Sequence, residues 1–118
     1  KCSFAVCDLS FISQTLVIPA VKNILTDKAQ LVSLIKPQFE CGREALGKNG
    51  VVKDKKQHIA AMRKVVSSLR VNGFGIKSIM RSSIKGGDGN TEFLVYAVLG
   101  GDDCITDKNL TEAADEKA

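Results

Sequence analysis

Three charged side chains stand beside short apolar runs, in a pattern that could handle a proton. Asp8 and Lys36 each end an apolar run, and Glu92 begins another. A lysine flanked by carboxylates is poised to handle a proton, and the positive charge of a neighbouring cofactor would lower the pKa of the lysine toward neutrality, as a general base requires. The alternative is three ordinary solvated charges at a sheet edge, and spacing alone leaves both interpretations open.

The apolar runs and helical periodicities predict the elements that would position these charges. In chain order they are a strand at 3–7, an apolar helical face over 17–25, a strand at 30–35, a helix from 54 to 72, and strands at 74–80 and 91–99. A turn is predicted at 26–28 and a long loop at 38–53. The continuous apolar run at 30–35 is typical of a parallel strand covered on both faces.

This order predicts half of a doubly wound α/β sheet, strand-helix-strand-helix-strand-strand. The last strand should be antiparallel, because the loop at 81–90 is too short for a crossover helix. Ligands of open α/β sheets bind beyond the carboxyl ends of the strands. Asp8 and Lys36 follow two such ends, and an antiparallel strand brings Glu92 to the same edge. The three side chains should therefore converge.

Charge divides the chain at residue 100. Residues 101–118 hold six acids and two lysines, a net charge of −4. Because the whole chain carries +4, the preceding 100 residues must carry +8. We predict a basic domain at 1–100 and an acidic tail at 101–118, solvated or partly ordered. A basic body suits RNA, because phosphate contacts release counterions. A solvated lysine-rich surface explains the charge equally well.

Cysteine usage and hydropathy exclude several classes of protein. The cysteines at positions 2, 7, 41 and 104 form no C-x-x-C pair and His58 is the only histidine, so no metal site is predicted. Free thiols fit a cytoplasmic protein. No apolar run approaches the roughly 18 residues of a membrane span.

Several segments resemble the TlyA family, namely 8–13 (DLSFIS), 35–40 (IKPQFE) and 85–94 (KGGDGNTEFL). Members of this family are hemolysin A-type ribosomal RNA 2′-O-ribose methyltransferases with an FtsJ-like Rossmann domain. Intervening residues between Gly42 and His58 fit the same pattern, and the resemblance covers about residues 3–100. It implies a Rossmann-like methyltransferase fold, ribosomal RNA as substrate and S-adenosylmethionine as methyl donor.

The resemblance also implies roles for individual residues. Such enzymes use a Lys-Asp-Lys-Glu tetrad, in which Asp8 matches the aspartate, Lys36 the second lysine and Glu92 the glutamate. Lys36 would orient or deprotonate the ribose 2′-hydroxyl, and the two acids would position it. The nearest candidates for cofactor contact are Asp8 and Ser10, and those for RNA contact are Arg43, Lys48, Lys53 and Lys85.

The departures from the family pattern predict an incomplete domain. The family's first lysine and its glycine-rich cofactor loop lie upstream of the Asp8 motif, and no G-x-G-x-x-G follows a strand here. We therefore expect the carboxyl-terminal half of the methyltransferase domain, inactive alone and binding S-adenosylmethionine weakly or not at all. Its first strand should expose an edge that invites dimerisation.

Two other functions remain open at this stage. A non-catalytic RNA-binding module would use the basic segment 43–56. A membrane-active cytolysin, which the hemolysin name suggests, has less support, since no segment is a spanning helix or a strongly amphipathic basic one.

Overall fold

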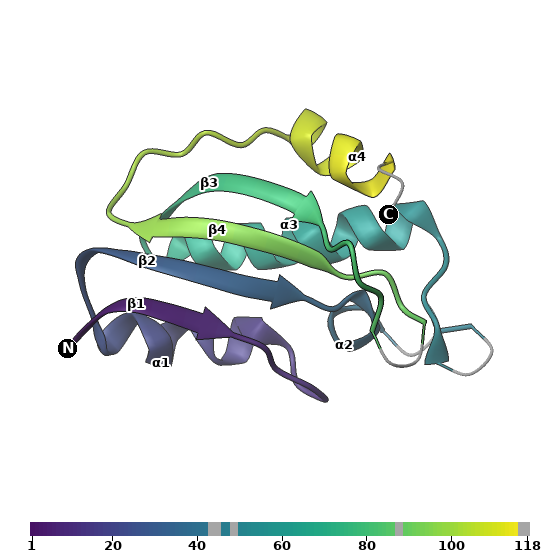
Figure 1. Ribbon diagram of the computed structural model, residues 1–118, viewed down its shortest axis with the longest axis horizontal. Helices are drawn as coiled ribbons and strands as arrows, with labels where there is room; N and C mark the ends of the chain where they lie inside the picture. Colours follow the sequence, from purple (N-terminus) through teal and green to yellow (C-terminus); the bar gives the residue numbers. More distant parts are fainter. Residues whose placement is uncertain (43–45, 48–49, 87–88, 116–118) are drawn as a thin grey trace.

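The computed structural model describes residues 1–42, 46–47, 50–86 and 89–115. Within these ranges the strands form one mixed sheet in the order β1-β2-β4-β3 (Figure 1). The strands are β1 (Cys2–Cys7), β2 (Leu25–Ile35), β3 (Phe74–Arg81) and β4 (Phe93–Leu99). The helices are η1 (Gln14–Leu16, a 3-10 helix), α1 (Ile18–Asn23), α2 (Pro37–Glu40), α3 (Lys55–Val71) and α4 (Asp107–Asp115).

Strand direction explains why distant charges meet at one edge. β1 and β2 run parallel, and β4 lies antiparallel between β2 and β3. The predicted antiparallel last strand is confirmed. Because Ile35 pairs with Phe93, the carboxyl end of β2 lies beside the amino end of β4. Lys36 and Glu92, the next residue in each case, therefore lie at the same edge of the sheet.

Helix α3 supplies most of the helical side of the core. Asp54 caps its first turn by accepting a hydrogen bond from the Lys56 N–H at 2.9 Å, and the chain leaves at Gly73, whose φ of 89° suits glycine. Met62, Val65 and Leu69 on its inner stripe are completely buried. Burying each contributes about 2 kcal/mol to the free energy of unfolding.

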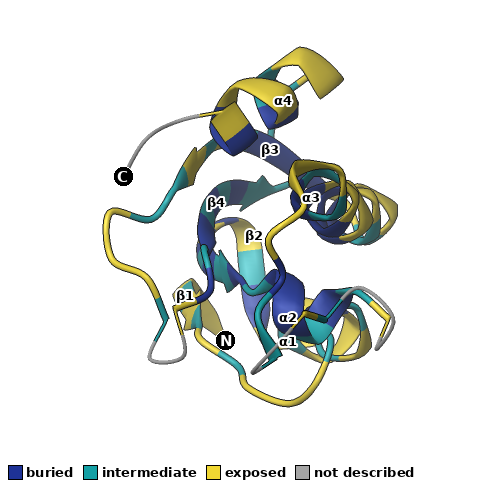
Figure 2. Cartoon of the chain, turned by 90° about the vertical axis from the view of Figure 1, so that its right-hand side faces the viewer, coloured by how far each residue is buried: buried dark blue, intermediate teal, exposed yellow. Residues whose placement is uncertain are grey.

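In the described part of the chain, α1, α2 and α3 lie on one face of the sheet, and α4 lies at its β3 edge (Figure 2). Leu31 and Val95 on that face are buried, whereas Val32, Leu94 and Tyr96 on the opposite face are half-buried. The prediction that the second strand is covered on both faces is therefore wrong for the described part of the chain.

The outer edge of β1 is also open, since β1 ends the strand order. Phe4 and Val6 near this edge are 53% and 65% exposed. The exposed edge expected from the sequence is thus present among the described residues, and dimerisation through it stays a prediction.

Two local predictions were wrong. The expected turn at 26–28 is a bulge within β2: pairing jumps from Cys2–Leu25 to Phe4–Gln30, and Lys28 has a φ of 63°. The expected loop after Lys36 begins instead with the short helix α2. Pro37 starts that helix, because proline needs no N–H partner at a first helical position.

Part of the carboxyl-terminal segment, for which the sequence predicted a solvated or partly ordered tail, is ordered and packed in the described residues. Leu110, Ala113 and Ala114 on α4 are buried and belong to the core that α3 and β3 also form. Their helical spacing was hidden among acidic residues. The division of the chain at residue 100 stays a prediction.

An extended stretch before α4 lies along β3. The Cys104 N–H donates to the Ile76 carbonyl at 2.8 Å. A side chain at Gly75 would place its Cβ 2.3 Å from the Gly101 carbonyl oxygen, so only glycine allows this approach. Residues 101–115 are therefore packed against the rest of the fold.

An ion pair between α3 and this stretch gives a first testable prediction. Arg70 Nε lies 2.5 Å from Asp103 Oδ2, and this hydrogen bond holds the pKa of Asp103 below its usual value. A lowered folded-state pKa stabilises the fold above the unfolded pKa of about 3.9, and the contribution disappears as pH falls through the folded pKa. Because the pair is partly exposed, Asp103→Asn should lower the free energy of unfolding at neutral pH by only about 0.5–1 kcal/mol.

Urea unfolding at neutral pH and at about pH 2, below the usual carboxyl range, measures this effect. The difference between wild type and Asp103→Asn should shrink on acidification. The neighbouring exposed Asp102 offers the matched control, Asp102→Asn. A loss of stability that is equal at both pH values would contradict the assignment.

Candidate active site

The centre of the site is an ion pair between the ends of β1 and β2. Lys36 Nζ lies 2.6 Å from Asp8 Oδ1 and 3.3 Å from Ser10 Oγ. The Lys36 side chain is 13% exposed, whereas that of Asp8 is 65% exposed. The predicted approach of Asp8 to Lys36 is therefore present, and it presents a fixed ammonium group beside an open carboxylate.

Glu92 lies at the same edge of the sheet but bonds to Gln38. It is buried, and its Oε2 accepts a hydrogen bond from Gln38 Nε2 at 3.2 Å. No ion pair joins it to Lys36 among the described residues. Gln38, one residue beyond Pro37, was not predicted as a site residue. Its amide nitrogen faces the carboxylate, and its buried Oε1 has no hydrogen-bond partner among the described residues.

The buried carboxylate of Glu40 connects the loop between β1 and η1 (residues 8–13, here the Asp8 loop) to helix α2, which follows Lys36. The Glu40 side chain is 2% exposed, accepts a 2.5 Å hydrogen bond from Ser13 Oγ and a 2.9 Å bond from the Gln14 N–H, and lies 3.6 Å from Lys64 Nζ. Glu40 belongs to the segment 35–40 that resembles the TlyA family, but nothing in the sequence predicted that it would bond to Ser13 and Gln14.

Gln14 extends the same network into the sheet. Its Nε2 donates to the Leu34 carbonyl at 2.7 Å, and its Oε1 accepts from Ser33 Oγ at 2.5 Å. Ser33 was the one detectable signal, since a serine interrupts the apolar run of β2. These bonds fix the loop that carries Asp8 against the strand that carries Lys36.

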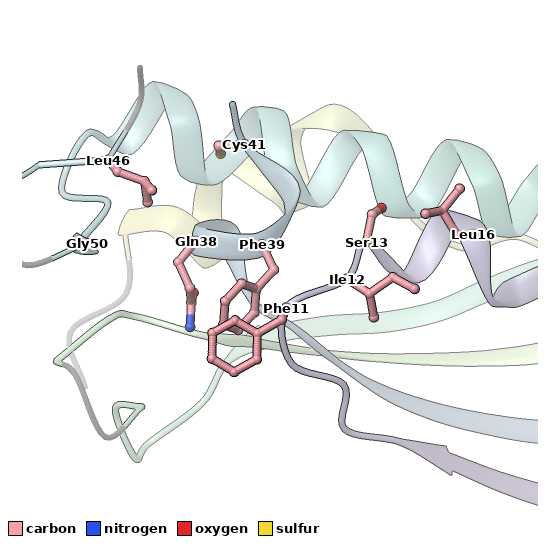
Figure 3. Close-up of a pocket in the computed structure, with 9 residues that line it drawn as sticks. All are labelled: Phe11, Ile12, Ser13, Leu16, Gln38, Phe39, Cys41, Leu46 and Gly50. Carbon is pink, nitrogen blue, oxygen red and sulfur yellow. The ribbon is translucent and has the colours of Figure 1, made fainter. Parts of the chain in front are cut away.

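Two phenylalanine rings, each three residues beyond a member of the ion pair in the sequence, pack against one another. Phe11 and Phe39 lie with ring centroids 5.0 Å apart, and both line a cavity of about 620 Å³ (Figure 3). Phe11 is 90% exposed and has a φ of 65°, a conformation that costs about 1–2 kcal/mol for a residue of this kind. Strain of this sort clusters at functional sites.

Comparison with known proteins identifies the fold that carries this arrangement. The sequence pattern of the family described as "FtsJ-like methyltransferase" matches residues 1–99. The chain belongs to the FtsJ-like methyltransferase family. Its mixed sheet is accordingly part of a Rossmann-like methyltransferase fold, as the sequence predicted.

Relatives of this FtsJ-like chain include proteins named for methylation of ribosomal RNA. It is 42% identical over 93 residues to "Putative rRNA methyltransferase YqxC" of Bacillus subtilis, covering 79% of this chain and 33% of that protein. It is 31% identical over 113 residues to "16S/23S rRNA (cytidine-2'-O)-methyltransferase TlyA" of Mycobacterium tuberculosis, covering 96% and 42%. The chain thus spans only about 33–42% of the length of these curated relatives.

A solved structure supports the same family assignment. The chain superposes on "Putative hemolysin from Streptococcus thermophilus" with a TM-score of 0.88 and 39% identity, covering 95% of this chain and 41% of that one. The resemblance to TlyA-type proteins is thereby confirmed. The roles of individual residues in the FtsJ-like chain stay predictions.

The structure describes only half of the predicted RNA contacts of this FtsJ-like chain. Arg43 and Lys48 lie outside the described residues. Lys53 and Lys85 are exposed and line a second cavity together, although 31 residues lie between them in the sequence. The two are thus brought together by the fold.

The described ranges of the FtsJ-like chain bear on three other features: a metal site, a reactive cysteine and a membrane-spanning helix. No cluster of three or more His, Cys, Asp or Glu side chains that could hold a metal ion is found there. Burial raises the pKa of the Cys7 thiol, which disfavours the reactive thiolate. None of the described helices has the length and hydrophobicity needed to cross a bilayer.

Proposed function

We propose that this chain is the carboxyl-terminal half of an enzyme that methylates a ribose 2′-hydroxyl of ribosomal RNA, with S-adenosylmethionine as methyl donor. The observation that carries the proposal is the Lys36–Asp8 pair at the carboxyl edge of the sheet, with Glu92 on the same edge. Family membership and the names of the relatives support the same reaction.

Lys36 would act on the ribose hydroxyl. In the reaction a bond forms between the 2′-oxygen and the methyl carbon, the bond from that carbon to sulfur breaks, and the hydroxyl proton is released. Lys36 Nζ would hold the oxygen in line or, as the neutral amine, accept that proton. Asp8 and Ser10 restrict Nζ to one position, because both bond to it.

Part of the methyl donor's site fits the residues present. Asp8 pairs with Lys36 through Oδ1 and is 65% exposed, so its carboxylate can also face a cation. Asp8 and Ser10 would hold that side of S-adenosylmethionine, which supplies an electrophilic methyl carbon when bound. The described residues include no glycine-rich turn between a strand and a helix that would hold the rest.

The aromatic pair favours a nucleic acid substrate over a small hydroxyl compound. Nucleobases stack on exposed aromatic rings, and each such stack is worth about 1–3 kcal/mol. Phe11 and Phe39 present such a surface, and each lies three residues beyond a member of the ion pair. A nucleotide could place its base on the rings and its ribose near Lys36.

The open surfaces suggest what the complete enzyme adds. The apolar face with Val32 and Tyr96, and the free edge of β1, would be covered by the additional length that the relatives possess. A homodimer through the β1 edge is the other way to cover that edge.

The test is methyl transfer by the complete protein and by this chain alone. With labelled S-adenosylmethionine and ribosomal RNA, the complete protein should transfer label to one 2′-oxygen, making the next phosphodiester bond resistant to alkali. The chain alone should transfer none and should show weak or no binding of the methyl donor by calorimetry. RNA carrying 2′-deoxyribose at the modified nucleotide is the matched control.

Each arm has its own contradicting result. Label on a base rather than a ribose, or none with the complete protein, would refute the proposed reaction. Tight calorimetric binding by the chain alone would show that the cofactor site is complete here. RNA binding by the complete protein without any methyl transfer would favour the non-catalytic RNA-binding module.

A further inference from the structure

A second cavity lies at the same edge of the sheet as Lys36, on the α3 and α4 side. Its volume is about 330 Å³. The cavity is lined by residues from five parts of the chain: the segment before α3, the amino end of α3, the end of β3, the loop before β4 and the last turn of α4. Figure 1 shows these parts meeting at one end of the molecule. It is separate from the apolar cavity at Phe11, with which it shares no lining residue.

Cationic side chains dominate the lining of this cavity. They are Lys53, Lys55, Arg81 and Lys85. Lys55 forms an ion pair with Asp115 at the end of α4, and no other acid pairs with this group among the described residues. Three cations therefore converge without a neutralising partner there, an arrangement that attracts an anion.

The Arg81 guanidinium is held by two contacts, but one of its N–H donors has no hydrogen-bond acceptor among the described residues. Its guanidinium carbon lies 5.8 Å from the centroid of the Phe93 ring, and its Nη2 donates to the Ala114 carbonyl at 2.5 Å. Its Nε is buried and has no hydrogen-bond partner among the described residues. An unmet donor on a charged side chain is costly, and Arg81 is one of the residues that line the cavity.

The neighbouring polar side chain already has a partner. His58 is buried, and its Nε2 forms a 2.8 Å hydrogen bond with the Val52 carbonyl oxygen. The cavity therefore offers donors from arginine and lysine, together with no free carboxylate from its own lining residues. This donor set fits a phosphate group, which arginine contacts in a planar fork and lysine contacts as a point charge.

We propose that this cavity binds a phosphate of the RNA backbone through Arg81, Lys53 and Lys85. The inference rests on the proposed function and assigns a place to the substrate strand. Lys36 and the cavity lie on one edge, because Arg81 ends β3 opposite Phe93, which pairs with Ile35 beside Lys36. A strand crossing this edge can put one ribose at Lys36 and a nearby phosphate in the cavity. Phosphate contact fixes register without reading sequence.

The test compares two double variants of the complete protein that carry the same change in net charge. Lys53→Gln with Lys85→Gln removes two cations from the cavity. Lys22→Gln with Lys108→Gln removes two exposed lysines that do not line it. Affinity for a ribosomal RNA fragment is measured by fluorescence anisotropy over a range of salt concentrations, beside the methyl-transfer rate.

The cavity variant should bind RNA about tenfold more weakly than the control variant at low salt, the scale of one lost charged hydrogen bond. Its plot of log affinity against log salt should be shallower by about one unit. The loss should be the same for a fragment of scrambled sequence. Arg81→Gln should act in the same direction, and circular dichroism shows whether it still folds; the lysine variant decides the matter if it does not.

Equal affinities and salt slopes for the two double variants would overturn the phosphate site, and would leave the proposed reaction standing if methyl transfer persists. Absence of methyl transfer by the wild type refutes the reaction instead, whatever the two variants do. Calorimetry with inorganic phosphate distinguishes a site for the RNA backbone from a site for a free phosphate compound. If phosphate binds and depends on Lys53 and Lys85 while RNA does not bind, the ligand is a free phosphate compound and the RNA assignment is wrong.

Discussion

Lys36→Ala in the complete protein is expected to lower the rate of methyl transfer by about 10²–10⁴-fold, the range typical of a lost general acid or base. The side chain lies at the surface end of β2 and is bonded to the exposed Asp8 and to Ser10, so its removal leaves the hydrophobic core intact. The fold should therefore survive while the hydroxyl loses its orienting group. Single-turnover rates with ribosomal RNA, together with circular dichroism, measure both effects.

Two further variants separate a role in the reaction from a loss of charge. Lys22→Ala removes an exposed lysine on α1 and should leave the rate unchanged. Asp8→Asn keeps the shape of the partner but weakens its hold on Nζ, so it should lower the rate by less than Lys36→Ala. If Lys36→Ala retains the wild-type rate, Lys36 has no part in the reaction.

Glu40→Ala is expected to lower the free energy of unfolding by about 3 kcal/mol, because it deprives buried partners of their acceptor. The Ser13 hydroxyl and the Gln14 N–H both donate to this carboxylate, whose side chain is 2% exposed. Urea unfolding followed by circular dichroism gives the value. The Asp8 loop should also lose its fixed position, so methyl transfer should fall even where the protein remains folded.

Glu112 provides the matched control for this prediction. It is exposed on α4, so Glu112→Ala should change stability by less than about 0.5 kcal/mol. Glu40→Gln keeps one acceptor oxygen and should lie between the two. Equal stabilities for Glu40→Ala and Glu112→Ala would show that the network around Glu40 contributes nothing to the fold.

The fold class and the central ion pair were predictable from the sequence because both follow from short-range patterns joined by a topological rule. Apolar runs of strand length located the four strands. A connection too short for a helix set the direction of the last one. If the first two strands were neighbours, Asp8 and Lys36 would meet at their carboxyl ends; the structure pairs these strands in parallel, with a 2.6 Å contact between the two side chains.

Other features depended on contacts between segments far apart in the chain. The apolar stripe of α4 contains only Leu110, Ala113 and Ala114, which is too weak a pattern to stand out in an acidic segment. The bulge around Lys28 arises because β1 pairs on both sides of it. The hydrogen bond from Gln38 to Glu92 joins helix α2 to the residue before β4, 54 positions further along the chain.

The sequence by itself determined the alternation of strands and helices, the edge at which Asp8, Lys36 and Glu92 gather, and the resemblance to methyltransferases. Local periodicity and strand direction are sufficient for these. Only the tertiary structure decided that Lys36 pairs with Asp8 while Glu92 bonds to Gln38, and that Glu40 joins the two halves of the site. It also decided that Lys53, Arg81 and Lys85 share one cavity. Such placements depend on side-chain packing between distant segments, which no local pattern records.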